Sequence, residues 1–401
     1  MENPKIRFKG FTKDWEQRKF GELYSKVSEK NDLSFGADKI ISVANMYFKE
    51  EVKESSDEYM RTYNVMRLGD IAFEGNKSKN YSHGRFVENT IGDGIVSHVF
   101  DVFRPTTSYD LLFWKYLINN EGVMGRIMAR CTNASTMMTN LVASDFLKEK
   151  ILVPSLKEQK KIGAYFDSLD HLITLHQRKC EQTKKLKKYM LQKMFPQNGA
   201  KVPEIRFYGF TYDWEQRKLK EIADKVSEKN KNNEFSEPFT NSAEQGIISQ
   251  KDYFDREIVN NENLDSYYIV RNDDFIYNPR ISVTAPVGPI NRNRLGRNGV
   301  MSPLYTVFRT HDIDNLYLEF YFKTTKWHRF MKLNGDSGAR FDRFTISSTQ
   351  FMEMPIPYPM LDEQRKMGEY FDSLDHLITL HQRKCDELKK MKKYMLQNMF
   401  I

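Results

Sequence analysis

Two long segments of the chain carry apolar or small residues in steps of three and four positions. In residues 155–195 these positions are Ile162, Tyr165, Phe166, Leu169, Leu172, Ile173, Cys180, Thr183, Leu186, Met190 and Met194. Such steps are typical of a helix that contributes the seam of a coiled coil. No Pro or Gly interrupts the segment after Gly163, and about 40 residues at 1.5 Å each predict roughly 60 Å of helix.

The same pattern returns near the end of the chain because the sequence is duplicated. Residues 360–400 match residues 155–195 at 31 of 41 positions, and residues 203–230 match residues 4–31 at 20 of 28. Between the matched blocks lie residues 32–154 and 231–359, which are similar in length but share little sequence. A period near 200 residues is too long for a solenoid repeat, so two whole modules stand in tandem.

The divergent stretches predict mixed domains. Short β-like runs such as Ile40–Val43 and Leu304–Phe308 are bounded by turn residues, and helical stretches follow near residues 109–129 and 313–332. Two identical seams can cover each other if they pack antiparallel. The predicted fold is α+β, with two mixed α/β domains separated by two long antiparallel coiled-coil helices and a pseudo-two-fold internal repeat. The predicted segments are a first domain (1–154), a first long spacer helix (155–196), a second domain (197–359) and a second long spacer helix (360–401).

The seam itself contains polar as well as apolar positions. The candidate seam residues are Leu169, Leu172, His176, Leu374, Leu377 and His381. Each His is interpreted as part of a polar layer that sets the register of the two helices. A metal-binding or catalytic role for either His lacks a second ligand nearby. The seam cysteines are interpreted as small packing residues.

Composition favours a globular protein with a polyanionic partner. Hydrophobic residues make up 40% and charged residues 29% of the 401 positions, and the formal net charge is +8. The start of the chain is polar, and no run of about 18 apolar residues occurs, so we expect neither a signal peptide nor a membrane span. The three cysteines fit neither a zinc site nor a disulfide framework, which favours a cytoplasmic location.

Motifs of catalysis are missing from the sequence. There is no phosphate-binding Gly-x-x-x-x-Gly-Lys loop, no Gly-x-Gly-x-x-Gly turn and no cluster with metal-ligand spacing. Asn278-Pro279-Arg280-Ile281 is the nearest match to the Asn/Asp-Pro-Pro-Phe/Tyr motif of adenine methyltransferases, but it lacks the second Pro and the aromatic residue. We therefore expect a chain that has no catalytic residues and binds no cofactor or metal.

Loops in both divergent domains are rich in side chains that read bases or hold phosphates. Arg pairs with guanine and Asn with adenine, while Lys holds phosphates. Solvated loops that bind nothing have a similar composition. These loops, however, occur at corresponding positions along two divergent domains, which favours DNA binding. A basic run from Arg178 to Lys193 is either a solvated helix face or a surface for DNA or an acidic partner. The DNA-binding candidates are Lys77, Lys79, Asn80, Tyr81, His83, Arg85, Arg130, Asn133, Arg280, Arg292, Arg294, Arg297, Arg340 and Arg343.

The order of these segments resembles the specificity subunits of type I restriction–modification enzymes. The resemblance rests on the Phe-x-Gly-Phe-x-x-x-Trp-Glu-Gln-Arg-Lys motif, at residues 8–19 and 207–218, and on an apolar-Pro strand that leads into a Glu-Gln helix in both halves. It implies that each divergent domain is a target recognition domain that reads half of a split, asymmetric DNA sequence. It also implies two modification subunits that use S-adenosylmethionine, and restriction subunits that use ATP and Mg²⁺.

The resemblance assigns the long helices a spacer role. Half-sites read on one face of the DNA should lie about a helical turn apart, roughly 34–36 Å. Two other functions stay open at this point. The chain could be a self-contained DNA-modifying enzyme with an unrecognised centre, or a protein–protein scaffold that does not read DNA.

Overall fold

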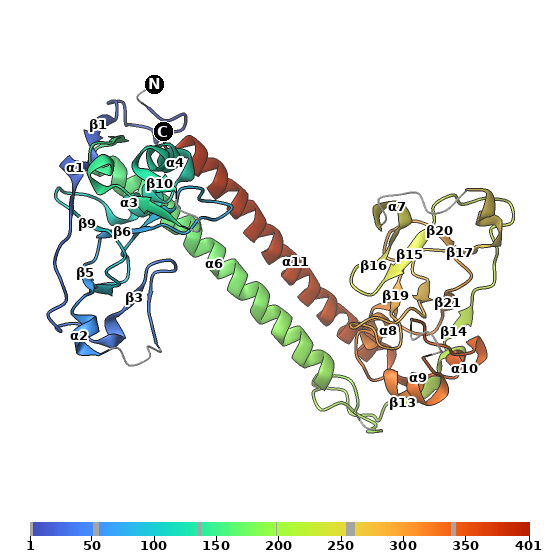
Figure 1. The fold of residues 1–401 in the computed structure, drawn as a ribbon. Helices are drawn as coiled ribbons and strands as arrows, with labels where there is room; N and C mark the ends of the chain where they lie inside the picture. Colours follow the sequence, from blue (N-terminus) through green and yellow to red (C-terminus); the bar gives the residue numbers. More distant parts are fainter. Residues whose placement is uncertain (1–2, 51–55, 135–137, 198, 254–260, 338–341) are drawn as a thin grey trace. The chain divides into compact units, whose positions relative to one another are not determined.

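The computed structural model describes residues 3–50, 56–134, 138–197, 199–253, 261–337 and 342–401. Contacts divide the chain into two compact units (Figure 1). Unit 1 comprises residues 1–178 and 382–401, and unit 2 comprises residues 179–381. The division falls within the two long helices, α6 (Leu156–Lys193) and α11 (Leu361–Asn398), so each unit contains a part of both. Among the described residues, no helix is long and apolar enough to cross a membrane.

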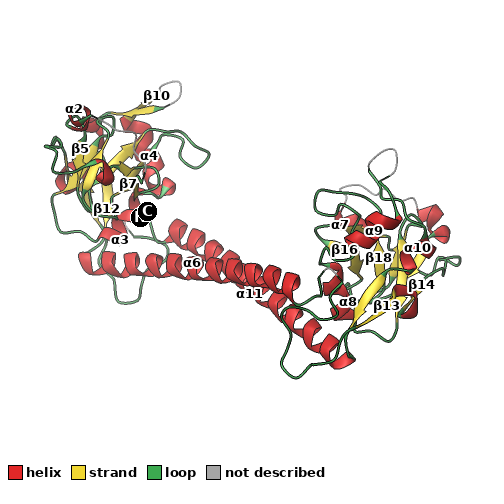
Figure 2. Ribbon diagram, turned by 90° about the horizontal axis from the view of Figure 1, so that it is seen from below, coloured by secondary structure: helices red, strands yellow, loops and turns green. Residues whose placement is uncertain are grey.

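Unit 1 combines short antiparallel strands with short helices (Figure 2). Its four-stranded sheet has the order β2-β9-β6-β7, formed by β2 (Tyr24–Lys26), β9 (Val102–Pro105), β6 (Ile71–Glu74) and β7 (Arg85–Glu88). Strand pairs are β1 (Glu16–Lys19) with β12 (Lys150–Val153), β3 (Ile41–Ser42) with β4 (Tyr47–Phe48), β5 (Asn64–Met66) with β8 (Gly94–Val96), and β10 (Thr132–Ala134) with β11 (Thr139–Leu141). The helices are α1 (Phe20–Leu23), η1 (Ala37–Lys39), α2 (Asp57–Met60), α3 (Leu111–Ile118), α4 (Glu121–Cys131) and α5 (Ala143–Phe146).

Unit 2 has a closely related topology. Its four-stranded sheet has the order β14-β21-β18-β19, formed by β14 (Ala223–Lys225), β21 (Thr306–Thr310), β18 (Phe275–Tyr277) and β19 (Ile290–Arg292). Strand pairs are β13 (Glu215–Lys218) with β22 (Pro355–Tyr358), β15 (Phe239–Ser242) with β16 (Gly246–Ser249), and β17 (Tyr268–Val270) with β20 (Gly299–Met301). The helices are η2 (Leu219–Glu221), α7 (Gln250–Tyr253), η3 (Asn261–Ser266), α8 (Asn315–Phe322), α9 (His328–Asn334) and α10 (Ser348–Met352).

The duplication therefore extends through the divergent domains. In unit 1, Ile71 of β6 pairs with Phe103 of β9 and Glu88 of β7, and in unit 2, Phe275 of β18 pairs with Phe308 and with Arg292 of β19. The predicted fold class, with two mixed α/β domains and an internal repeat, is confirmed. Strand pairing preserves this register although the side chains differ, because the buried faces need only apolar residues of suitable size.

A set of polar contacts that the sequence analysis missed also recurs in the two domains. The backbone N–H of Arg67 donates to Asp70 at 2.8 Å, and Arg104 binds the same buried carboxylate at 2.9 Å. In unit 2 the N–H of Arg271 and the side chain of Arg309 bind Asp274 in the same way. The sequence carries a sign of these contacts, because an Arg-x-x-Asp motif occurs at corresponding positions of the two domains, at residues 67–70 and 271–274.

Both cores are aromatic and extend onto the long helices. In unit 1, Phe166 of α6 and Phe400, just beyond α11, stack with ring centroids 5.6 Å apart beside Phe113 of α3. In unit 2, Phe195 and Phe371 occupy the corresponding place against α8. Each domain is thus continuous in packing with the helix segments of its own unit.

The Glu-Gln pair at the start of each long helix attaches that helix to its domain. Glu158 is 1% exposed and binds Arg7 through both carboxylate oxygens, at 2.6 and 2.8 Å. Gln159 accepts from the N–H of Asp110 at 3.1 Å and donates to the carbonyl of Pro154 at 3.0 Å. Glu363 and Gln364 repeat these bonds in unit 2 with Arg206, Asp314 and Pro359.

The helices pack antiparallel within each unit, but the seam differs from the predicted one in two residues. Leu169 and Leu374 are 5% exposed, as a seam requires. Leu172 and Leu377 are 39% and 40% exposed, so their prediction as seam residues is wrong. Ile173 and Cys180, which the apolar spacing also included, are buried, as are Cys385 and Leu388, and the thiol of Cys385 faces the carbonyl of Ile173 at 3.6 Å. His176 and His381 are half-buried beside this seam.

Candidate nucleic-acid interface

In unit 1, the loop between β6 and β7 lies against the β10–β11 hairpin. The N–H of Thr139 donates to the carbonyl of Gly75 at 2.8 Å, and its hydroxyl donates to the carbonyl of His83 at 2.9 Å. A β-bridge joins Asn76 to Met138 at the same place. These bonds attach the two ends of the loop to the hairpin and leave the loop itself, residues 76–80, exposed.

Two glycines make this contact possible. A Cβ on Gly75 would lie 2.2 Å from the carbonyl oxygen of Thr139. Gly84 has a φ of +77°, and a Cβ there would lie 2.6 Å from the carbonyl oxygen of Glu74. Only residues without a Cβ allow the loop and the hairpin to approach so closely.

Four predicted residues share this exposed surface. Lys77, Lys79 and Asn80 are exposed in the loop, and Asn133 is exposed on β10, where it pairs with Asn140. His83 is half-buried at the base of the loop. Cationic and amide side chains are therefore exposed on the loop and on the hairpin beside it, and these are side chains suited to phosphates and base edges.

The remaining candidates of unit 1 make internal contacts. Arg85 binds Glu74 at 2.8 Å and the carbonyl of Ala44 at 2.6 Å, and its guanidinium lies 5.1 Å from the ring centroid of Tyr81. Arg130 forms a two-bond ion pair with Glu149. Arg85 and Tyr81 thus support the loop from below, whereas Arg130 remains half exposed.

Unit 2 builds a corresponding surface from equivalent parts of its fold. The loop between β18 and β19 lies against residues 342–345, with the N–H of Phe344 donating to the carbonyl of Pro279 at 2.7 Å. Arg280 and Arg343 face each other across a β-bridge, and both are exposed. No ion pair involves either side chain within the described residues. Arg340, another predicted candidate, lies outside the described residues.

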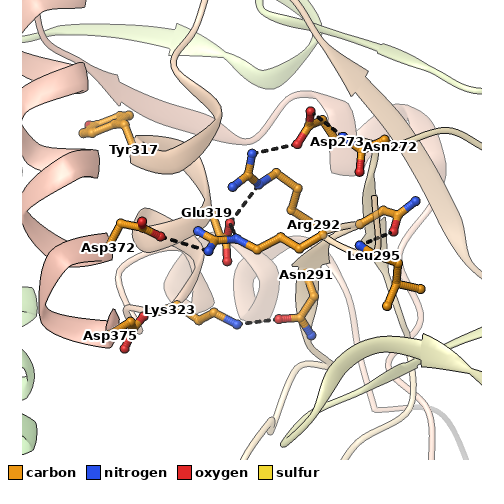
Figure 3. Close-up of polar contacts among 12 residues, drawn as sticks. Asn272, Asp273, Asn291, Arg292, Leu295, Tyr317, Glu319, Lys323, Asp372 and Asp375 are labelled. Carbon is orange, nitrogen blue, oxygen red and sulfur yellow. Dashed lines mark hydrogen bonds and ion pairs between the residues drawn. The ribbon is translucent and has the colours of Figure 1, made fainter. Parts of the chain in front are cut away.

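Arg292 and Arg294 of the same stretch lie in a separate ion-pair network (Figure 3). Arg292, with its side chain 11% exposed, binds Asp273 and Glu319, each at 2.8 Å. Arg294 shares Glu319 and reaches Asp372 of α11 at 2.9 Å. Both arginines, like Arg280, were predicted to bind DNA. The structure corrects this for Arg292, because its guanidinium is nearly buried and is held by two carboxylates, which leaves it inaccessible to a base.

Arg297 and the neighbouring amides have structural contacts as well. Arg297 binds Glu237 through two bonds of 2.8 Å while half exposed. Asn293 is fully buried and donates to the carbonyls of Arg271 and Arg297. Asn89 makes equivalent bonds in unit 1, which marks this Asn as a turn-forming residue of both domains.

At one corresponding position of the two four-stranded sheets, unit 1 has an acidic residue and unit 2 has a basic one. Glu88 of β7 corresponds in register to Arg292 of β19, and it is 2% exposed with neither carboxylate oxygen hydrogen-bonded. Burial raises the pKa of Glu88 to about 9. Counting from the N-cap residues Asp110 and Asp314, Lys115 of α3 corresponds to Glu319 of α8. The two domains therefore exchange the positions of the acidic and the basic side chain at this sheet–helix contact.

The described residues show no group of three His, Cys, Asp or Glu side chains able to hold a metal ion. What they show is a duplicated α/β fold with two exposed, cation- and amide-bearing loop surfaces and an antiparallel helix pair. This combination defines a class of modular proteins that present two related surfaces from one chain.

Comparison with known proteins gives the family. The chain matches the family of type I restriction modification DNA specificity domains twice, over residues 12–185 and 212–390, and it belongs to that family. It is similar to the type I restriction enzyme MjaVIII specificity subunit of Methanocaldococcus jannaschii, with 26% identity over 264 residues, 62% of this chain and 60% of the relative. It is also similar to the putative type I restriction enzyme MjaX specificity subunit of the same organism, with 24% identity over 96% of this chain and 92% of the relative.

Two solved structures share the fold. The HsdS subunit from Thermoanaerobacter tengcongensis is 18% identical, with a TM-score of 0.50 over 96% of both chains. The S subunit of a type I restriction–modification system from M. genitalium is 14% identical, with a TM-score of 0.54 over 100% of this chain and 99% of the other.

Proposed function

We propose that this chain is the DNA-reading subunit of a type I restriction–modification complex and that it reads a split, asymmetric target. The observation that carries the proposal is the pair of loop surfaces built on equivalent parts of the two domains. One presents Lys77, Lys79 and Asn80, and the other presents Arg280 and Arg343. Equivalent placement with different side chains gives two readers with different base preferences.

The partners in this proposal are two modification subunits and the restriction subunits. The modification subunits use S-adenosylmethionine, the restriction subunits use ATP and Mg²⁺, and this chain contributes no catalytic residue. The exposed leucines of the long helices support two equivalent docking sites. Leu172 and Leu175 on α6 are 39% and 37% exposed, and Leu377 and Leu380 on α11 are 40% and 50% exposed. Identical exposed apolar residues on two helices fit two copies of one partner.

The test is to co-express the chain with a modification subunit from the same system, purify the complex and map methylated bases on genomic DNA. The expected result is one split, asymmetric motif with a fixed gap. Exchange of residues 32–154 for those of another specificity subunit should then change only one half of the motif. Methylation without a motif, or no complex, would overturn the proposal, and methylation by the chain alone would identify a self-contained enzyme.

A further inference from the structure

A basic groove in unit 1 adjoins the loop surface of the first domain. It encloses about 820 Å³ and is lined by Tyr81 of the β6–β7 loop, the end of α3, the start of α4 and the last turns of α11. Lys115, Lys389, Lys392 and Lys393 line it, against the acids Asp170 and Glu121. The groove is thus cationic overall, and its apolar wall includes Val123, Leu396 and Phe400.

The acids of the groove are already bound. Lys392 binds Asp170 at 2.6 and 2.7 Å, and the hydroxyl of Tyr116 donates to the same carboxylate at 2.8 Å. Glu121 accepts from the hydroxyl of Ser82 at 3.4 Å. Lys389 and Lys393 are exposed, and within the described residues neither forms an ion pair. Together with Lys115, which lies 5.4 Å from the ring centroid of Tyr116, they supply the unneutralised charge.

The groove is physically joined to the loop that carries the reading side chains. Tyr81 both lines the groove and donates to the carbonyl of Asn119 at 3.4 Å, and Ser82 adds the bond to Glu121. A strand of DNA bound at Lys77 and Lys79 would therefore have an adjacent cationic surface for its backbone. Phosphates attract Lys without regard to base sequence, which is the chemistry this groove offers.

Unit 2 repeats two of these lysines and differs at the third. Lys184 and Lys188 are the counterparts of Lys389 and Lys393; Lys184 binds Glu181 at 3.1 Å, and Lys188 is exposed. The counterpart of Lys115 is Glu319, which binds Arg292 and Arg294. Lys187, the counterpart of Lys392, keeps its ion pair with Asp375, and Lys323 is bound to Asn291. The two halves of the protein consequently differ in charge at the position of Lys115, where unit 2 has an acid.

We infer that the Lys115–Lys389–Lys393 groove binds the DNA backbone flanking the first half-site and contributes a salt-dependent part of the DNA affinity. This inference rests on the proposed function. It assigns the last turns of α11 a direct DNA contact in addition to their packing role.

The test measures DNA affinity of the full chain, in complex with its modification subunits, as a function of salt. The double variant Lys389→Ala, Lys393→Ala should lower affinity by about 10-fold near 0.1 M salt. It should also reduce the slope of log K against log salt by about 1–2, since each phosphate contact contributes about 0.9. A duplex cut at the outer edge of the first half-site should remove most of this difference.

The matched control is Arg383→Ala, Lys390→Ala, which removes the same charge from exposed positions of α11 outside the groove. Equal slopes for the two double variants would overturn the inference while the parent still bound its target. Loss of modification subunits from the groove variant, with its DNA slope unchanged, would also overturn it and would identify a protein interface. A parent complex that shows no target binding would instead contradict the proposed function.

Discussion

Lys392 of α11 binds Asp170 of α6 through two contacts of 2.6 and 2.7 Å, and Lys187 of α6 binds Asp375 of α11 at 2.5 and 2.6 Å. The two pairs are counterparts in the duplication, one in each unit. Each ammonium also lies over an aromatic ring of the adjoining domain, Tyr116 at 5.1 Å and Phe320 at 5.0 Å. Each pair thus connects both long helices and a domain at one point.

The first prediction concerns the Lys392–Asp170 pair. A double-mutant cycle with Lys392→Met and Asp170→Asn, followed by urea unfolding, should give a coupling energy of about 1 kcal/mol. The value is modest because both side chains are partly exposed and water screens the pair. Lys390→Met is the control for loss of charge on α11. A coupling energy indistinguishable from zero would mean that the pair does not stabilise the helix contact.

The second prediction separates the seam from the exposed leucines. Leu169→Glu and Leu374→Glu should each destabilise the protein by about 3 kcal/mol or more, because an unpaired charge would be buried. Leu172→Glu and Leu377→Glu lie one turn away and should leave the melting temperature within a few degrees of the parent. Thermal unfolding of all four variants makes the comparison.

The exposed leucines should instead affect assembly. Leu172→Glu should reduce co-purification of one modification subunit and Leu377→Glu that of the other, because each lies in one of two equivalent apolar patches. The double variant should lose both. Normal assembly of the double variant would refute the docking role, whatever its stability.

The helices illustrate what periodicity in a sequence can and cannot give. Spacing of three and four residues predicted two long helices and an antiparallel seam, which the structure shows in α6 and α11. It could not choose between Leu169 and Leu172, which lie on adjacent edges of the apolar stripe. That choice depends on which face meets the partner helix and which is left for another molecule, and this is a property of the assembly rather than of local sequence.

The loops illustrate a different limit. Composition identified the stretch around Arg280 to Arg297 as cationic, and the fold divides it between an exposed surface and an ion-pair network. The partners that bury Arg292, namely Asp273 and Glu319, lie 19 and 27 residues away in the chain. Only the pairing of β18 with β19 and the packing of α8 bring them together, so no local pattern could separate Arg292 from Arg280.

The fourth prediction follows from that division. Arg280→Ala and Arg343→Ala should weaken DNA binding by about 1–3 kcal/mol wherever the side chain reads a base, and should relax one half of the target while leaving stability unchanged. Arg292→Ala should destabilise the protein by about 2 kcal/mol or more, since it leaves Glu319 partly unpaired in a buried site. Binding titrations and urea unfolding of the three variants give both quantities. The distinction fails if Arg292→Ala is as stable as the parent and alters the motif.

The last prediction uses the buried carboxyl of Glu88, whose pKa is raised to about 9 by burial. The nearby charge of Lys115 opposes this rise and that of Asp110 adds to it, while Tyr24 and Tyr109 lie in the same buried region. Between about pH 4.5 and pH 9 the folded protein holds a proton that the unfolded chain has released. Stability contributed by the protonated form is therefore fully present below pH 4.5 and declines as the pH rises through this window.

Glu88→Gln keeps the shape of the side chain and removes the ionisation. Its effect on the free energy of unfolding should be small at pH 5 and should grow to a stabilisation of about 4 kcal/mol at pH 8. Urea unfolding at several pH values measures the difference, and Glu16→Gln, at an exposed position of β1, controls for the change in net charge. A difference that stays constant with pH would show that Glu88 is ionised in the folded protein. Lys115 would then be its partner, and the opposite charges of Glu88 and Lys115 would form the counterpart of the Arg292–Glu319 ion pair.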